Sequence, residues 1–183
     1  MSISSPCAMP DRRRILLLGL GLFASAAMAT LPEPVRALAP GWRMLGSGEA
    51  RFVGLRLYDA SLWVSGQAWS DSQPYALVLT YARGFSRSTL VSTSLDEMRR
   101  LGAGDEAALV RWKADLERVF PDVAEGETLV GVNLPGRGAA FYHQGRLTGE
   151  VADPDFARTF FAIWLDRRTR VPALRARLFG QSA

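Results

Sequence analysis

The sequence predicts an α+β protein in which a large antiparallel sheet is covered on one face by helices. Segments between residues 51 and 151 alternate apolar and polar residues as strands do, and tight turns join several of them. Other segments repeat apolar residues at helical spacing, and the broadest such face, with Phe156, Phe160 and Trp164, lies between Asp153 and Asp166. We expect this helix to lie across the sheet as the main cover of the core.

The first 29 residues have the pattern of an export signal. Arg12–Arg14 precede the apolar run Ile15–Ala24, and Ala27-Met28-Ala29 supplies small residues where a signal peptidase cuts. Removal of this segment leaves residues 30–183 as one domain, which we expect in the periplasm or outside the cell. Asp11 stands where a twin-arginine signal usually has a hydroxyl residue, which favours general secretion, and both routes stay open.

The residue types exclude several kinds of site. The only cysteine, Cys7, leaves with the signal, and His143 is the only histidine. The mature chain therefore has no thiol nucleophile and too few ligands for the usual zinc sites, so we predict no metal and no cofactor. Export also argues against nucleic acid as a partner.

Five arginines cluster near the C-terminus, and two interpretations of them stay open. They could meet the phosphates of an anionic membrane surface, or they form a solvated helix face. The cluster consists of Arg167, Arg168, Arg170, Arg175 and Arg177.

The first elements after the signal are expected to be extended. Residues 31–41 contain three prolines and predict an irregular lead-in, and Gly46-Ser47-Gly48 predicts a turn into a strand. Residues 51–64 predict one long strand with a bulge or bend near Asp59-Ala60. One face of this strand is expected to carry Phe52, Arg56 and Tyr58.

A second strand and two helices are expected next. The second strand runs from Tyr75 to Arg83, with Tyr81 and Arg83 on one face. Ser86 or Ser88 can cap a helix that ends near Leu101, and a further helix begins near Asp105 and ends before Pro121.

The remaining elements complete the sheet and its cover. Three short strands predict an antiparallel meander over residues 128–134, 139–144 and 146–151. The aromatic helix follows, capped by Asp153, and an amphipathic helix over 172–179 ends the chain.

A series of short motifs runs through nearly the whole mature chain in a fixed order. The motifs are Gly46-Ser47-Gly48 through Arg51-Phe52, Leu57 to Trp63, Tyr81-Ala82-Arg83, Glu97 to Arg100, Trp112, Phe120 to Val123, Phe141-Tyr142, Gly145, Asp153 to Ala157 and Phe161 to Asp166. Together they resemble the chalcone isomerase-like family, in its exported bacterial branch. The resemblance implies an open-faced β-sandwich with an apolar cleft between sheet and helices.

The same resemblance bears on activity. Plant chalcone isomerases close a flavanone ring with an arginine, a threonine and a tyrosine, and here Val53 stands for the threonine and Ala103 for the tyrosine. Arg43 could replace the arginine. Without the two hydroxyls the polar network for the reaction is incomplete, so the resemblance implies a non-catalytic binding protein, and no catalytic residue is assigned.

Other proteins with this fold bind fatty acids in the cleft, which implies a fatty acid or another apolar anionic ligand here. The candidate ligand-binding residues are Arg56, Tyr58, Tyr81, Arg83 and Arg43. Two alternatives stay open: an intramolecular lyase or isomerase of the chalcone isomerase type that uses non-standard residues, and an envelope interaction module whose cleft is filled by side chains.

Overall fold

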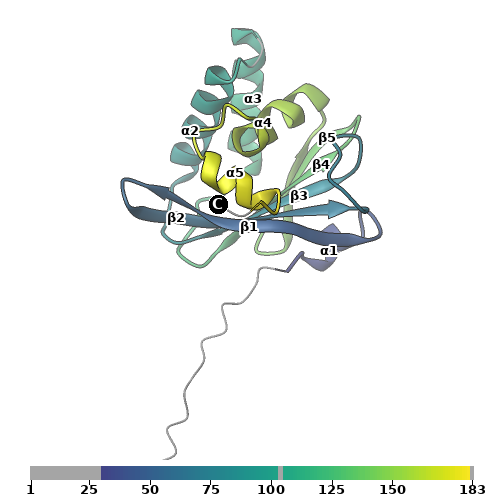
Figure 1. The fold of residues 1–183 in the computed structure, drawn as a ribbon. Helices are drawn as coiled ribbons and strands as arrows, with labels where there is room; N and C mark the ends of the chain where they lie inside the picture. Colours follow the sequence, from purple (N-terminus) through teal and green to yellow (C-terminus); the bar gives the residue numbers. More distant parts are fainter. Residues whose placement is uncertain (1–29, 103–104, 182–183) are drawn as a thin grey trace, which may run out of the picture.

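The protein is built on one six-stranded antiparallel sheet in which each strand pairs with the next in the chain (Figure 1). The computed structural model describes residues 30–102 and 105–181, so the expected signal segment and Ala103 lie outside the described residues. The strands are β1 (Trp42–Phe52), β2 (Leu55–Ser65), β3 (Tyr75–Tyr81), β4 (Thr128–Leu134), β5 (Gly138–His143) and β6 (Arg146–Val151).

Four helices lie on one face of the sheet and one short helix lies on the other (Figure 1). The helices are α1 (Glu33–Arg36), α2 (Arg87–Arg100), α3 (Glu106–Val119), α4 (Pro154–Leu165) and α5 (Pro172–Leu178). The arrangement confirms the predicted α+β class, with α2 to α5 as the cover and α1 on the outer face.

Capping side chains begin the three longest helices where the sequence predicts. The Ser86 hydroxyl accepts the Thr89 N–H at 3.2 Å at the start of α2, and the Asp105 carboxylate accepts the Ala108 N–H at 2.7 Å at the start of α3. Asp153 accepts two N–H groups of the first turn of α4. Each contact satisfies a backbone donor that has no partner inside its helix.

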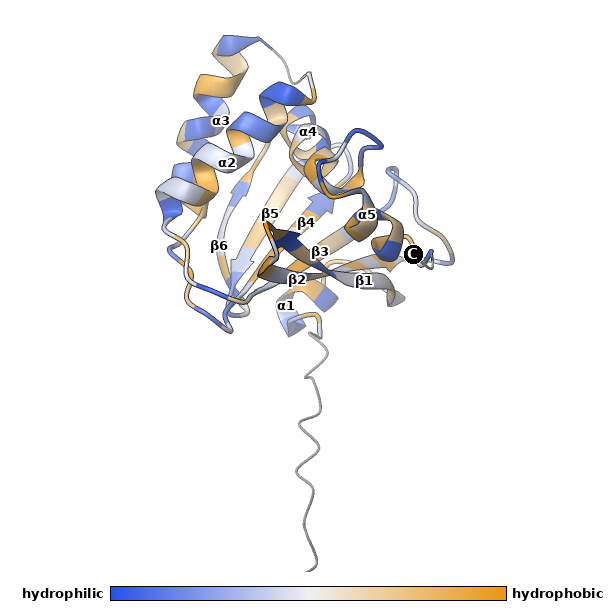
Figure 2. Ribbon diagram, turned by 60° about the vertical axis from the view of Figure 1, so that its left-hand side comes forward, coloured by the Kyte–Doolittle hydropathy of each residue, from blue (hydrophilic) through white to orange (hydrophobic). Residues whose placement is uncertain are grey.

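The main core lies between the inner face of the sheet and the helices. Figure 2 shows hydrophobic residues on the central strands beneath the helices and hydrophilic residues on the outward turns of α2 and α3. On the inner face, Leu62, Leu77 and Leu79 pack with Phe156, Phe160 and Trp164 in one cluster. The aromatic helix α4 therefore covers the core, as its apolar face predicts.

A smaller apolar cluster lies on the outer face of the sheet. Leu31 and Val35 are buried there among residues of the middle strands, including Val78, Val130 and Val132. The prediction of an irregular lead-in over 31–41 was therefore wrong at α1, because Val35 gains a buried position when the segment turns into a short helix.

The predicted long strand over residues 51–64 is interrupted by a hairpin turn, so that residues 51–52 end β1 and residues 55–64 belong to β2. Phe52 pairs with Leu55, and the two residues between them both have positive φ, 47° at Val53 and 79° at Gly54. Gly54 was the local signal for this turn, since two-residue hairpin loops of type I′ need positive φ at both positions. The apolar residues on both sides of the loop hid it.

The glycine motif near the chain start lies inside β1 and does not form a turn. A Cβ atom on Gly46 would stand 2.1 Å from the carbonyl oxygen of Arg177 in α5, so only glycine allows this helix to approach the strand so closely. The prediction of a turn here was wrong, because the reason for the glycine is a tertiary contact.

A bulge at Leu57 changes the faces of β2. Ala50 pairs with Tyr58 whereas Arg51 pairs with Arg56, which leaves Leu57 without a partner in β1. Tyr58 therefore points to the helix side and Arg56 to the outer side, beside Glu49 and Asp59. The bend was predicted two residues too late, at Asp59-Ala60, where the pairing is regular.

Candidate ligand-binding site

A cavity of about 480 Å³ lies between the inner face of the sheet and helices α2 and α4. Most of its wall is apolar. The lining residues are Phe52, Leu57, Tyr58, Leu79, Tyr81, Phe85, Thr89, Leu90, Thr93, Ser94, Glu97, Phe120, Leu129, Phe160, Ile163, Trp164, Thr169, Arg170 and Val171. Because Phe52, Thr93 and Arg170 are also exposed, the cavity opens to solvent beside them. Its size falls within the roughly 300–1,000 Å³ of small-molecule sites.

Two phenols stand next to each other in the wall. The rings of Tyr58 and Tyr81 lie edge to face with their centroids 5.9 Å apart. The Tyr58 oxygen accepts the Trp164 Nε1–H at 2.9 Å, which leaves the Tyr58 proton for another acceptor. Within residues 30–102 and 105–181 the Tyr81 hydroxyl has no hydrogen-bond partner, so two O–H donors are available to a ligand.

Burial raises the pKa of both phenols. Desolvation raises the pKa of Tyr58, against the smaller opposing effect of the Trp164 hydrogen bond, and desolvation likewise raises the pKa of Tyr81 well above its usual value. Both groups are therefore protonated at neutral pH and can donate hydrogen bonds. Such a pair suits a carbonyl or carboxylate oxygen.

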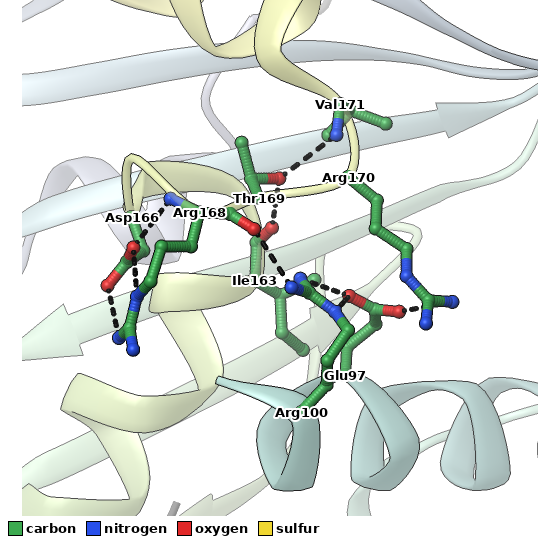
Figure 3. Close-up of polar contacts among 8 residues, drawn as sticks. All are labelled: Glu97, Arg100, Ile163, Asp166, Arg168, Thr169, Arg170 and Val171. Carbon is green, nitrogen blue, oxygen red and sulfur yellow. Dashed lines mark hydrogen bonds and ion pairs between the residues drawn. The ribbon is translucent and has the colours of Figure 1, made fainter. Parts of the chain in front are cut away.

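An acidic side chain and two arginines meet at the edge of the same cavity (Figure 3). The Glu97 side chain is 11% exposed, and Arg100 and Arg170 approach its two oxygens at 2.7 Å and 3.0 Å. One carboxylate thus faces two guanidinium groups, so the cluster carries a net positive charge. Arg170 is the member that is largely exposed.

The loop after α4 carries Arg170 and is fixed to its surroundings. The Thr169 hydroxyl donates to the Ile163 carbonyl at 2.6 Å and accepts the Val171 N–H at 3.2 Å (Figure 3). The Arg100 guanidinium also donates to the Arg168 carbonyl at 2.9 Å, which ties the loop to α2. The backbone position of Arg170 is therefore set by both helices.

The structure brings two of the five sequence-predicted ligand residues to the cavity, Tyr58 and Tyr81. Arg56 does not line it, because the bulge at Leu57 turns this side chain to the outer face, where it binds Asp59. Arg83 is exposed beyond the end of β3. Arg56 and Arg83 therefore lie on the solvent side and do not join the two phenols in the cavity.

The fifth candidate, Arg43, lies at the other end of the β1–β2 pair. Its guanidinium donates to the carbonyl of Gly66 at 2.9 Å and to the carbonyl of Gln67, which fixes the segment after β2. It does not line the cavity. Val53, aligned with the family threonine, lies at the hairpin turn with 85% of its surface exposed and does not line the cavity either.

Sequence reasoning missed Glu97, Arg170 and Trp164 as residues of the site. A partial signal existed, since Glu97 and Arg100 are spaced for an ion pair on one helix face. Arg170 was grouped with the C-terminal arginines, and only its approach to α2 distinguishes it.

Across residues 30–102 and 105–181, no group of three His, Cys, Asp or Glu side chains is arranged to hold a metal ion. In the same part of the chain, no helix has the length and hydropathy needed to cross a bilayer.

Sequence and structure comparisons identify the class to which this fold and cavity belong. The sequence model of the family described as chalcone isomerase-like matches residues 27–180. The chain therefore belongs to the chalcone isomerase-like family.

One solved structure with a similar fold is a fatty-acid binding protein of Arabidopsis thaliana, at 12% identity and a TM-score of 0.59. The match covers 77% of this chain and 88% of that one, and at this identity it shows the fold alone. A search of curated proteins gave no match.

Proposed function

We propose that this protein binds an apolar molecule with an anionic head, such as a fatty acid, in the cavity between sheet and helices. The observation that carries the proposal is the pair of protonated phenols, Tyr58 and Tyr81, in an otherwise apolar wall. The apolar wall would bury a hydrocarbon chain, and the phenols would donate to its head group. The fatty-acid binding of the similar Arabidopsis protein supports this choice of ligand.

Arg170 would supply the charge that an anionic head requires. Arg170 lines the cavity and its guanidinium binds Glu97, and Glu97 keeps Arg100 as a second partner. A ligand carboxylate can therefore recruit Arg170 without leaving the Glu97 carboxylate unpaired, which would otherwise be costly in a poorly hydrated place.

Export is proposed on the sequence pattern of residues 1–29. We propose that the protein acts in the periplasm or outside the cell after cleavage near Ala29. N-terminal sequencing of the protein from a periplasmic fraction tests this, and a chain there that begins at Thr30 is the expected result. A full-length chain confined to the cytoplasm would contradict it.

Native mass spectrometry of the purified, processed chain tests the binding function. We expect a discrete adduct that extraction identifies as an acidic lipid, or uptake of added hexadecanoic acid by an empty chain. Tyr81→Phe and Arg170→Ala should weaken binding by about tenfold each, as expected for the loss of one good polar contact.

Arg111→Ala is the matched control, because Arg111 is an exposed arginine of α3 outside the cavity wall. It should bind as the unchanged protein does. A chain that is empty as purified and refuses hexadecanoic acid would overturn the proposed function. Turnover of an enone would then be the next activity to measure.

A further inference from the structure

The tip of the β1–β2 hairpin exposes a run of large apolar side chains. Phe52 is 68% exposed, Val53 85% and Leu55 52%, and Gly54 is the only other residue of the tip. In Figure 1 this hairpin reaches past α2 at the left of the molecule. Single exposed apolar residues are ordinary, whereas three within four residues at a protruding turn form a patch that needs a partner.

Val53 is also an unfavourable residue for this turn on conformational grounds. Its φ of 47° lies in the left-handed region, which a β-branched side chain adopts at a cost, and asparagine followed by glycine is the preferred pair there. The hairpin thus keeps an apolar side chain at a position where both solvation and backbone geometry favour a polar one.

The tip adjoins the mouth of the cavity. Phe52 belongs to both, because its side chain lines the cavity and is exposed at the tip. Leu57, next along the hairpin, lines the cavity and its carbonyl accepts the Ala82 N–H at 2.9 Å. This contact places the segment of Arg83 beside the base of the tip.

The charges around the tip favour an anionic partner. Arg51 and Arg56 are paired with Glu49 and Asp59 on the outer face of the hairpin, so these four residues have no net charge.

Arg83 and Arg87 are exposed, and within the described part of the chain neither forms an ion pair. Asp122 accepts the backbone N–H of Arg87, so one carboxylate stands beside these two arginines. The lip of the cavity next to the tip therefore retains a positive charge.

We infer that the hairpin tip docks the protein on an anionic phospholipid bilayer, with the apolar side chains entering the interface and Arg83 and Arg87 meeting lipid phosphates. Apolar insertion combined with cationic contact is the usual basis of reversible membrane binding. Docking in this orientation turns the cavity mouth toward the bilayer, from which an acidic lipid can enter. The entry of a lipid from the bilayer rests on the proposed function, whereas the docking itself does not.

The C-terminal arginines are a poorer docking surface. Arg168 binds Asp166, Arg170 binds Glu97, and Arg175 donates to the Leu165 carbonyl and lies over the Phe179 ring. Most of that cluster is therefore occupied within the chain.

Co-sedimentation of the processed chain with vesicles tests the inference, using phosphatidylcholine alone and an equal mixture with phosphatidylglycerol. The unchanged protein should bind the mixed vesicles more strongly. Val53→Asn should lower that binding by about tenfold, which is the order expected for one apolar side chain that no longer enters the interface. Arg83→Glu should remove the preference for the anionic vesicles.

Val53→Asn separates a loss of docking from a loss of folding. Asparagine before Gly54 suits the turn, so the variant should melt at the same temperature as the unchanged protein or higher. Val110→Asn is the matched control, because Val110 is 67% exposed on α3 away from the tip. It should bind vesicles normally. All variants begin at the same residue, so any contribution of the start of the chain to vesicle binding is the same in each of them.

Two results would overturn the inference. One is equal vesicle binding by Val53→Asn and the unchanged protein. The other is self-association in sedimentation velocity that Val53→Asn abolishes, which would assign the tip to a second copy of the chain. Uptake of hexadecanoic acid in vesicle-free buffer is measured separately, and its failure would count against the proposed function alone.

Discussion

Trp164 and Tyr58 form a hydrogen bond in the wall of the cavity, and this single contact gives the two neighbouring phenols different roles. Tyr58 is fixed by the indole N–H, whereas Tyr81 is held by ring contacts with Tyr58 and Phe85. The first phenol is therefore part of the structure as well as of the proposed site.

Removal of each hydroxyl should separate these roles. Tyr58→Phe leaves the Trp164 N–H without its acceptor, so we expect a loss of about 1–3 kcal/mol in the free energy of unfolding. Tyr81→Phe should change stability by less than about 0.5 kcal/mol, because its hydroxyl has no partner within the described residues. Urea denaturation of both variants measures the difference. Equal losses would contradict the assignment of the hydrogen bond.

At the scale of elements, the contact between α5 and β1 depends on one missing side chain. Gly46→Ala would place a methyl group 2.1 Å from the Arg177 carbonyl oxygen and 2.7 Å from that of Leu178. The helix must then move, and we expect a cost of about 1–3 kcal/mol or more. Ser47→Ala is the control, because Ser47 is an exposed neighbour on the opposite side of the strand. Thermal melts of the two variants that coincide would refute the prediction.

Elements with local signals were predictable from the sequence, and those that depend on distant partners were not. Ser86, Asp105 and Asp153 mark helix starts by their own hydrogen bonds, so α2, α3 and α4 lie where they were predicted. The bulge at Leu57 and the fit of Gly46 against α5 depend on pairing that one segment does not reveal.

The residues of the candidate site also divide into those that the sequence indicated and those that depend on tertiary contacts. Tyr58 and Tyr81 were chosen because the family resemblance implies polar groups near an apolar cleft, whereas the strand pattern alone did not separate them from Arg56 and Arg83. Arg170 could not, since its position depends on the loop after α4 lying against α2. The resemblance thus pointed to two phenols of the wall, whereas the charged edge of the cavity arises from tertiary packing.

For the whole molecule, acid should destabilise the fold. Hydrogen bonds from the Arg168 side chain and backbone lower the pKa of Asp166 to about 2, and the pKa values of Glu106 and Glu127 are also lowered by hydrogen bonds. A carboxyl group whose pKa is lowered in the folded state stabilises that state at pH values above its unfolded pKa of about 4. This contribution is lost as pH falls toward 2.

Melting temperatures recorded from neutral pH to pH 2 measure this effect. We expect the melting temperature to fall below about pH 4, because the carboxylates with lowered pKa values become protonated there and lose their stabilising contacts. Asp166→Asn and Arg168→Ala should each lower the neutral-pH value and make the acid decline shallower. A melting temperature in Asp166→Asn that is unchanged at neutral pH would contradict the assigned pKa shift.

The docking of α5 on β1 has a consequence for how the protein reaches its folded state. Helix α5 follows the other described elements in the sequence and covers the first strand of the sheet, so a chain that still lacks residues 172–178 leaves that face of β1 uncovered. This contact joins two segments that lie far apart in the sequence, so the burial of the surface of β1 must wait until residues 172–178 are present.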